Sequence, residues 1–425
     1  MRYSGRDVEF YFYAQLFLWP RLVCLRGRSV VCRRLRSGKN SFQRPREDNP
    51  LGVFLCLFWC VAILENSMSS LEDRHLVGIE TLPPPTELKT RHAISARATQ
   101  VVLRARNEIR DVLHGRDTRR QVVVVGPCSL HDPKLALDYA RLLLPLAHEL
   151  EEELILLMRT YFEKPRTTVG WKGLVNDPHL DGSCRVAAGL AGARKLLLEI
   201  SDLGLPCATE FLDPISPQYL ADAVAWTAIG ARTTESQTHR EMASGLSMPV
   251  GFKNSTDGTV GVAIDAMVAA SHPHSFLGIR SDGTAAVVKT AGNPDTHVVL
   301  RGGRDRTNYD RQTIEAVAGR LSVRGVMIDC SHGNSRKDPT LQGSVLHDVA
   351  TYLRRGSGGV LGVMLESHIH AGRQDWTPGR ALEYGISITD GCIGFEETKK
   401  LLRELAAVVR PVKMRRASTA NASAA

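Results

Sequence analysis

Residues 121–129 read QVVVVGPCS, in which four consecutive valines lead to a Gly-Pro pair. Consecutive β-branched residues are typical of a strand that is buried on both faces, as in a parallel sheet covered by helices. The next segment, residues 133–152, has apolar residues at helical spacing and begins with a proline, which suits the first turn of a helix. The stretch therefore predicts a strand followed by a helix.

The same unit recurs along the chain. Further apolar runs are found at 153–159, 207–212, 225–232, 248–253, 296–301, 325–329 and 359–366. Helical patterns separate most of these runs, and eight β/α units in about 300 residues favour a (β/α)8 TIM barrel over an open sheet. Residues 274–294 do not fit the repeat, because their two short runs around Ser-Asp-Gly predict a β-hairpin inserted into the barrel.

The chain is expected to divide into distinct parts. We interpret residues 1–67 as a poorly ordered, non-native upstream extension, with the natural start of translation at Met68. An N-terminal arm is predicted at 68–115, the barrel at 116–412 and a disordered tail at 413–425. Mass spectrometry of the native N-terminus tests the expected start.

Charge and cysteine content limit the function classes. The formal net charge is +9, but residues 1–67 hold eleven Lys and Arg against five acidic residues, so most of the excess lies there. No basic stripe with interleaved aromatic residues is present, which argues against a nucleic-acid partner. Nine cysteines without a CxxC pair suit a reducing compartment, and we expect a cytoplasmic protein. The apolar run 51–64 is shorter than a membrane-spanning helix, so no membrane association is predicted.

Positive charges follow the predicted strands. Four apolar runs end in a cation, and two more cations lie just beyond the second run; the set is Arg159, Lys164, Arg166, Arg232, Lys253 and Arg301. In a TIM barrel the carboxyl ends of the strands surround the active site, where these cations would repel one another unless an anion lies between them. The pattern indicates two small anionic substrates, because Arg binds phosphate and carboxylate in a bidentate manner.

A second set of strand-end residues carries metal-ligand chemistry. It comprises Cys128, His332, Glu366 and Asp390. A thiolate, an imidazole and two carboxylates suit a divalent transition metal, but scattered residues of these types are more often ordinary buried groups. Cys330 with His332 as a nucleophile and its base is a weaker alternative, since residues two apart on a strand rarely meet in that way. Spacing alone leaves these interpretations open.

Several motifs bear a closer resemblance to a known family. They are VVVVGPCSLHDP, LMRTYFEKPRTTVGWKG, GARTTES, GFKN, HVVLRGG, MIDCSHGNSRKD, GVMLESHIHAGRQD and YGISITDGCIGFEET. Between about residues 70 and 410 the chain resembles the type I 3-deoxy-D-arabino-heptulosonate 7-phosphate (DAHP) synthases of bacteria and fungi, which are regulated by aromatic amino acids. The resemblance implies the first step of the shikimate pathway, in which phosphoenolpyruvate, D-erythrose 4-phosphate and water give DAHP and phosphate.

The resemblance also implies residue roles. The phosphoenolpyruvate ligands would be Arg232, Lys253 and Arg301, with Arg159, Lys164 and Glu210 beside them. Arg166 and Thr167 would contact erythrose 4-phosphate. One divalent ion of Mn, Fe, Co or Zn would be held by Cys128, His332, Glu366 and Asp390. Lys164, Cys128 and His332 would be the catalytic residues, with Lys164 as the proton donor, and Cys330 would only pack.

The resemblance also implies that the arm at 68–115 serves regulation or oligomerisation and that the barrel at 116–412 is catalytic. Two alternative functions and an inhibitor site are considered with it. A related synthase that makes an eight-carbon sugar acid from arabinose 5-phosphate, and a non-catalytic sensor of phosphorylated metabolites, are the alternative functions. The family is commonly inhibited by Phe, Tyr or Trp, and the positions that resemble the inhibitor site are Pro217, Gln218, Ser247 and Phe276. A homodimer or homotetramer is expected.

Overall fold

The structure is a computed structural model that describes residues 10–14, 21–26, 29–34, 72–166, 169–356, 358–377 and 381–422, with side chains described only between 72 and 410. The chain forms two compact units, residues 1–81 and 82–425. Within the described residues, no helix is both long and apolar enough to cross a membrane.

The second unit contains a closed barrel of eight parallel strands. They are β4 (Gln121–Gly126), β5 (Leu154–Arg159), β6 (Cys207–Glu210), β7 (Trp226–Ile229), β8 (Val250–Lys253), β11 (Thr296–Leu300), β12 (Val326–Asp329) and β13 (Val360–Glu366). Their order around the barrel is β11-β12-β13-β4-β5-β6-β7-β8, and every strand residue is buried. This closed barrel confirms the prediction of a (β/α)8 TIM barrel. The apolar runs of the sequence suit strands that are buried on both faces.

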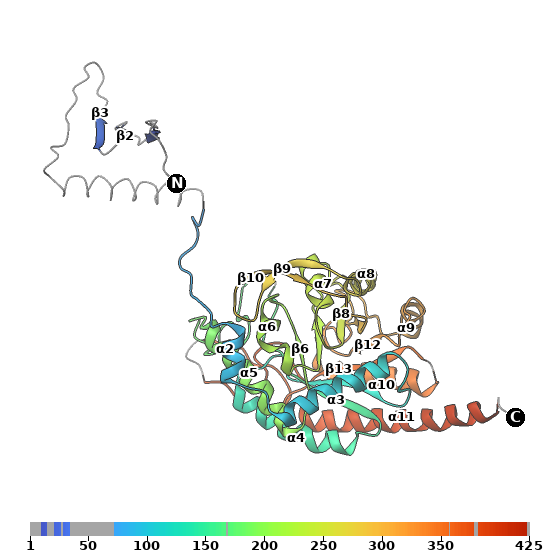
Figure 1. Cartoon of the computed structure of the whole chain (residues 1–425). Coiled ribbons are helices and arrows are strands. Elements are labelled where there is room, and N and C mark those ends of the chain that lie inside the picture. Colours follow the sequence, from blue (N-terminus) through green and yellow to red (C-terminus); the bar gives the residue numbers. More distant parts are fainter. Residues whose placement is uncertain are drawn as a thin grey trace. The chain divides into compact units, whose positions relative to one another are not determined.

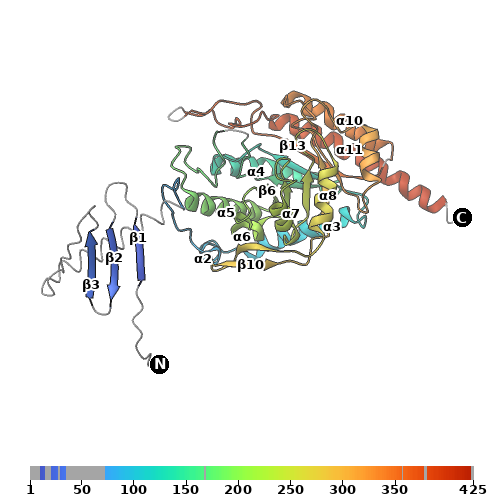
Figure 2. The ribbon, with the colours of Figure 1, turned by 90° about the horizontal axis from the view of Figure 1, so that it is seen from above.

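Helices surround the barrel (Figures 1 and 2). They are α4 (Pro133–Glu149), α5 (Val186–Leu203), α6 (Ser216–Leu220), α7 (Gln237–Ser244), α8 (Gly261–Ala270), α9 (Arg311–Ala318), α10 (Gln342–Arg354) and α11 (Phe395–Ala422), with short 3-10 turns η1 (Ala221–Ala223) and η2 (Pro339–Leu341). Helix α4 begins at Pro133, as predicted. The side chain of Asp132 caps it by accepting hydrogen bonds from the backbone N–H groups of Lys134 and Leu135.

Helix α3 (Ala96–Leu113) closes the N-terminal end of the barrel. Its buried face, including Ile109 and Leu113, packs with apolar residues of the barrel interior. The backbone N–H of Arg324, just before β12, donates to the carbonyl of Leu113 at 2.8 Å. Asp295, just before β11, accepts from Arg110 Nε at 2.6 Å. Apolar packing and hydrogen bonds together hold α3 against this end of the barrel.

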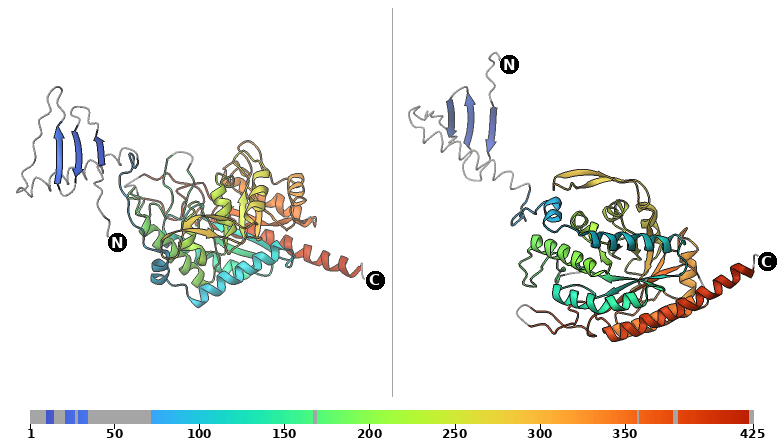
Figure 3. Two further views of the ribbon diagram at one scale, coloured as in Figure 1. Left: turned by 45° about the horizontal axis from the view of Figure 1, so that its top comes forward. Right: turned by 60° about the horizontal axis from the view of Figure 1, so that its bottom comes forward.

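The inserted hairpin is present as predicted. It consists of β9 (Ser275–Ile279) and β10 (Ala285–Lys289), which pair in antiparallel fashion and form the yellow ribbon at the edge of the barrel unit in Figure 3. Gly283 at its tip has a φ of +84°, a conformation that favours glycine. Next to the tip, Ser281 O accepts from the Thr86 N–H of α2 (Pro85–Arg91) at 2.8 Å.

The two ends of the chain complete the description. In the first unit, β1 (Phe10–Ala14), β2 (Arg21–Arg26) and β3 (Ser29–Arg34) form an antiparallel sheet; the rest of 1–67 lies outside the described residues. The interpretation of 1–67 as an upstream extension stays a prediction. Helix α11 continues to Ala422, through residues for which the sequence predicted a disordered tail. Alanine, Lys, Arg and Met in KMRRASTANA favour that helix.

Candidate active site

The predicted site residues lie at the carboxyl ends of the barrel strands. Arg159, Glu210, Lys253 and Glu366 are the last residues of β5, β6, β8 and β13. Cys128 and Arg301 follow β4 and β11 within two residues. Parallel strands present their carboxyl ends to the same end of the barrel, so residues far apart in sequence converge there.

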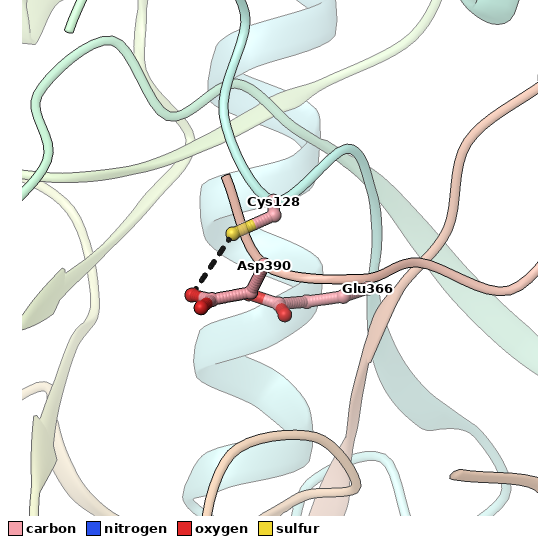
Figure 4. Close-up of side chains that lie close together, drawn as sticks. All are labelled: Cys128, Glu366 and Asp390. Carbon is pink, nitrogen blue, oxygen red and sulfur yellow. Dashed lines mark hydrogen bonds between the residues drawn. The ribbon is translucent and has the colours of Figure 1, made fainter. Parts of the chain in front are cut away.

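Three of the four predicted metal ligands lie together (Figure 4). One ligand atom from each of Cys128, Glu366 and Asp390 lies within 4.8 Å of the others. Cys128 Sγ is 3.4 Å from Asp390 Oδ2. The first two side chains are buried, whereas that of Asp390 is 49% exposed. One soft sulfur and two hard oxygens at this spacing fit the donor set of a divalent transition metal.

His332, the fourth predicted ligand, stands beside this group. Its Nε2 atom is 3.7 Å from Glu366 Oε1. The residue has a φ of +55°, which is uncommon for a residue with a side chain and marks a strained turn after β12. Cys330, in the same segment, is fully buried within the apolar core, as expected of a packing residue.

Lys164 faces the same group. Its Nζ is 2.9 Å from Cys128 Sγ and 3.7 Å from Asp390 Oδ2. Burial and the charge of Glu366 raise the pKa of the Cys128 thiol to about 12, although Lys164 opposes the shift. Burial alone would lower the pKa of Lys164, but Cys128 and Asp390 hold it above its usual value. The ammonium therefore keeps its proton beside the cluster.

Two buried ion pairs extend from the cluster into the barrel mouth. Arg159 Nη2 donates to Glu366 Oε1 at 2.8 Å, and Lys253 Nζ donates to Glu210 Oε2 at 2.8 Å. Both cations lie near the ring of Tyr161, whose centroid is 3.5 Å from Arg159 Cζ and 5.4 Å from Lys253 Nζ. Such fully buried charges are costly unless they are paired. Their presence at this end of the barrel indicates a functional site.

Two further cations are close enough to affect one another. Burial and the positive charge of Arg232 lower the pKa of Arg301, while Asp329 raises it. Arg301 is nearly buried, with 9% exposure, and Arg232 is exposed. An anion between them would relieve this repulsion.

The predicted erythrose 4-phosphate contacts lie on the loop after β5. Arg166 is exposed, and its Nε donates to the carbonyl of Trp171 at 2.7 Å. Thr167 lies outside the described residues.

Comparisons with known proteins show the family of this chain. A sequence profile of the DAHP synthetase I family matches residues 93–403. The chain belongs to the DAHP synthetase I family. It is 52% identical over 341 residues to the Tyr-sensitive phospho-2-dehydro-3-deoxyheptonate aldolase of Escherichia coli, covering 79% of this chain and 95% of that protein. It is 50% identical over 348 residues to the tyrosine-inhibited enzyme of Schizosaccharomyces pombe, covering 80% and 93%.

A solved member of the DAHP synthetase I family has the same fold. The Francisella tularensis phospho-2-dehydro-3-deoxyheptonate aldolase superposes with a TM-score of 0.77 at 46% identity, covering 79% of this chain and 98% of that one. The predicted family and enzyme activity, DAHP synthesis, are therefore confirmed. Neither the eight-carbon sugar acid synthase nor the non-catalytic sensor finds support among the matches.

The residues predicted as a regulatory site come from separate segments of this family's fold. Pro217 and Gln218 lie in the first turn of α6, Ser247 is exposed in the loop after α7, and Phe276 lies on β9 of the hairpin. Near the first pair, Tyr219 Oη donates to the Pro83 carbonyl at 2.9 Å. This bond ties α6 to the prolines before α2.

Sequence reasoning missed groups that hold the cluster in place. Gln342 donates from Nε2 to the Glu366 carbonyl at 3.0 Å and accepts from the Glu366 N–H at 2.8 Å. Ser129 and Thr389, the neighbours of two proposed ligands, join their hydroxyls at 2.7 Å. Ordinary polar residues of these types carry no sequence signal; only the contacts reveal them.

Proposed function

We propose that the carboxyl end of the barrel is where this chain joins phosphoenolpyruvate to D-erythrose 4-phosphate. The observation that carries the proposal is the position of the Cys128, Glu366 and Asp390 group directly beside buried cations. The anionic substrate and the aldehyde would be brought together where the groups that bind anions adjoin the residues that would hold a metal.

Phosphoenolpyruvate would bind between the cations inside the mouth. Arg232 and Arg301 suit its phosphate or carboxylate, because guanidinium groups bind such groups through two parallel hydrogen bonds. Lys253 and Arg159 would border the ligand, and Glu210 would offset part of their charge through its 2.8 Å contact with Lys253. The buried ion pairs already order these side chains before the substrate arrives.

Erythrose 4-phosphate would bind nearer the solvent. Arg166 and Thr167 are proposed to contact its phosphate. The exposed position of Arg166 supports an outer subsite, since this guanidinium can reach a phosphate without desolvating a buried pair.

One divalent ion would be held by Cys128, His332, Glu366 and Asp390, and Mn, Fe, Co and Zn all suit this donor set. When bound, it would supply Lewis-acid chemistry that polarises the aldehyde carbonyl or a water. The chain's own groups complete the site. Lys164 holds a proton at Nζ next to the group and is proposed to donate it to the alkoxide that forms as the enol carbon attacks the aldehyde. Water then adds to the former enol carbon, and phosphate leaves by C–O cleavage.

Phosphate release in a coupled assay with both substrates and a divalent metal tests this proposal. We expect turnover with erythrose 4-phosphate and little with arabinose 5-phosphate. Lys253→Met should raise KM for phosphoenolpyruvate more than KM for the aldehyde, whereas Lys195→Met on the outer face of α5 should change neither. Equal effects on both KM values, with folding intact by circular dichroism, would contradict the assignment.

We also propose that an aromatic amino acid inhibits the enzyme. The matched relatives are named Tyr-sensitive, tyrosine-inhibited and Phe-sensitive, which supports regulation of this kind. The inhibitor site would be formed by Pro217, Gln218, Ser247 and Phe276. We further propose that the chain assembles as a homodimer or homotetramer, and light scattering can measure this.

Assays with Phe, Tyr and Trp would identify the inhibitor. Phe276→Ala should abolish the inhibition without changing turnover. Leu277→Ala is the matched control, because Leu277 is 87% exposed and points to the opposite face of β9. Inhibition that survives Phe276→Ala would remove this residue from the site.

A further inference from the structure

A buried carboxylate, Asp329, lies next to the proposed metal site without being one of its ligands. It ends β12 and is fully buried. Its Oδ1 accepts from the Ser331 N–H at 3.0 Å and from Ser331 Oγ at 2.6 Å. Its Oδ2 is 2.9 Å from Nδ1 of His332, an ion-pair contact, and makes no hydrogen bond within the described residues. One carboxylate oxygen is thus directed at a single imidazole nitrogen.

The neighbouring groups determine which nitrogen of His332 carries the proton. An ionised carboxylate only accepts, so the hydroxyl proton of Ser331 goes to Asp329 Oδ1. The same hydroxyl oxygen lies 2.8 Å from His332 Nδ1 and can then only accept from it. Both neighbours of Nδ1 are acceptors. In the neutral ring the proton is therefore expected on Nδ1, which leaves a lone pair on Nε2.

The backbone of His332 aims this lone pair. Nε2 lies 3.7 Å from Glu366 Oε1, on the side of the proposed ligands. The left-handed turn that places it there is held by two hydrogen bonds, from the Lys337 N–H to the His332 carbonyl at 2.7 Å and from the Gly333 N–H to the Arg301 carbonyl at 2.9 Å. The ring is thus fixed in both position and tautomer before any ligand binds.

We propose that Asp329 is a positioning residue, which keeps His332 protonated at Nδ1 so that Nε2 is free to bind a divalent cation together with Cys128, Glu366 and Asp390. This inference rests on the proposed metal site. Histidine ligands commonly donate their second N–H to a carboxylate in this way, which fixes the ring and raises its basicity. In the opposite tautomer, a proton on Nε2 would block the bond to the metal.

Asp329 also has an electrostatic effect on the anion-binding groups. Its charge opposes the lowering of the Arg301 pKa by burial, and it adds to the effect of Glu210 that raises the pKa of Lys253. A loss of activity in a variant would therefore not separate metal binding from substrate binding. Binding of the metal alone does, because no anion takes part.

The experiment titrates the full chain, freed of metal by a chelator, with Co²⁺ in the absence of substrates. The thiolate-to-Co²⁺ absorption reports binding through Cys128. We expect Asp329→Asn to raise the Kd for Co²⁺ by about 10- to 100-fold, because its amide can donate to Nδ1 and favour the wrong tautomer. Asp338→Asn is the matched control and should match the unchanged protein, since Asp338 is an exposed carboxylate of the same loop that accepts from Thr340.

The outcomes distinguish a failure of the role proposed for Asp329 from a failure of the proposed metal site. If the unchanged chain shows no Co²⁺ absorption, the metal site itself is wrong. If it binds Co²⁺ and Asp329→Asn binds equally well, only the role of Asp329 is refuted. Nitrogen-15 NMR of histidine-labelled metal-free protein provides a reading that no folding defect can disturb, with the His332→Gln spectrum used for assignment. It should show His332 protonated at Nδ1, and protonation at Nε2 would overturn the inference.

Discussion

The two ends of the barrel differ in the kind of side chain that they bury. At the N-terminal end, Ile109 and Leu113 of α3 are fully buried among apolar side chains. At the carboxyl end, Arg159, Lys253 and Glu366 are almost as inaccessible, yet all three carry charge. Apolar burial stabilises the fold, whereas buried charge costs several kcal/mol per ion unless it is paired. The N-terminal end of the barrel therefore contributes mainly to stability, whereas the carboxyl end bears an energetic cost that its chemistry requires.

The sharpest break in this comparison should come from Lys164. Replacing it by Ala removes the ammonium 2.9 Å from Cys128 Sγ. We expect kcat to fall by about 10²- to 10⁴-fold with a smaller change in substrate affinity, because a positioned proton donor contributes that much. Steady-state kinetics measures it. Lys172→Ala, an exposed lysine of the same loop, is the control, and a normal kcat in Lys164→Ala would remove Lys164 from this role.

The opposite end should respond in stability. Leu113→Ala is expected to cost about 2–5 kcal/mol of unfolding free energy, because it leaves a cavity in a packed region. Denaturant unfolding gives the value, and kcat of the folded fraction should stay unchanged. Leu103→Ala on the same helix, where the side chain is 52% exposed, should have little effect. A large loss of kcat without a loss of stability would show that the two ends are not separate.

A smaller effect should depend on pH. His297 on β11 accepts from Trp226 Nε1 at 2.8 Å, and burial lowers its pKa to about 4. The unfolded chain binds this proton below about pH 6.5 and the folded chain only below about pH 4, so stability is lost as pH falls between these values. Over that range, we expect the free energy of unfolding of His297→Gln to fall by about 3 kcal/mol less than that of the unchanged protein. Unfolding curves at pH 7 and pH 4 measure it, and parallel pH profiles would refute the assignment.

The sequence was most informative where one local pattern determines structure. The eight strands were predictable because continuous apolar runs such as 121–126 suit only buried parallel strands. Composition gave little guidance at 413–422, where residues expected to be disordered belong to α11. Four of the six cations could be predicted as a group, since each one ends an apolar run of the sequence and all strands end on the same side of the barrel.

The metal site depended on contacts that spacing does not encode. Cys128 and Asp390 are 262 positions apart and 3.4 Å apart in space. The resemblance to known synthases indicated both residues, whereas spacing alone did not favour a metal. The contacts of Tyr161 with two cations and of Gln342 with the backbone of Glu366 became visible only in three dimensions. Closure of the barrel creates these neighbours.

Anomalous diffraction from crystals grown with Mn²⁺ would show directly whether the charged end of the barrel is built around one divalent ion. We expect a single strong anomalous peak enclosed by Cys128 Sγ, His332 Nε2 and the carboxylates of Glu366 and Asp390. No peak there in crystals of active enzyme, or a peak bound by other residues, would contradict it.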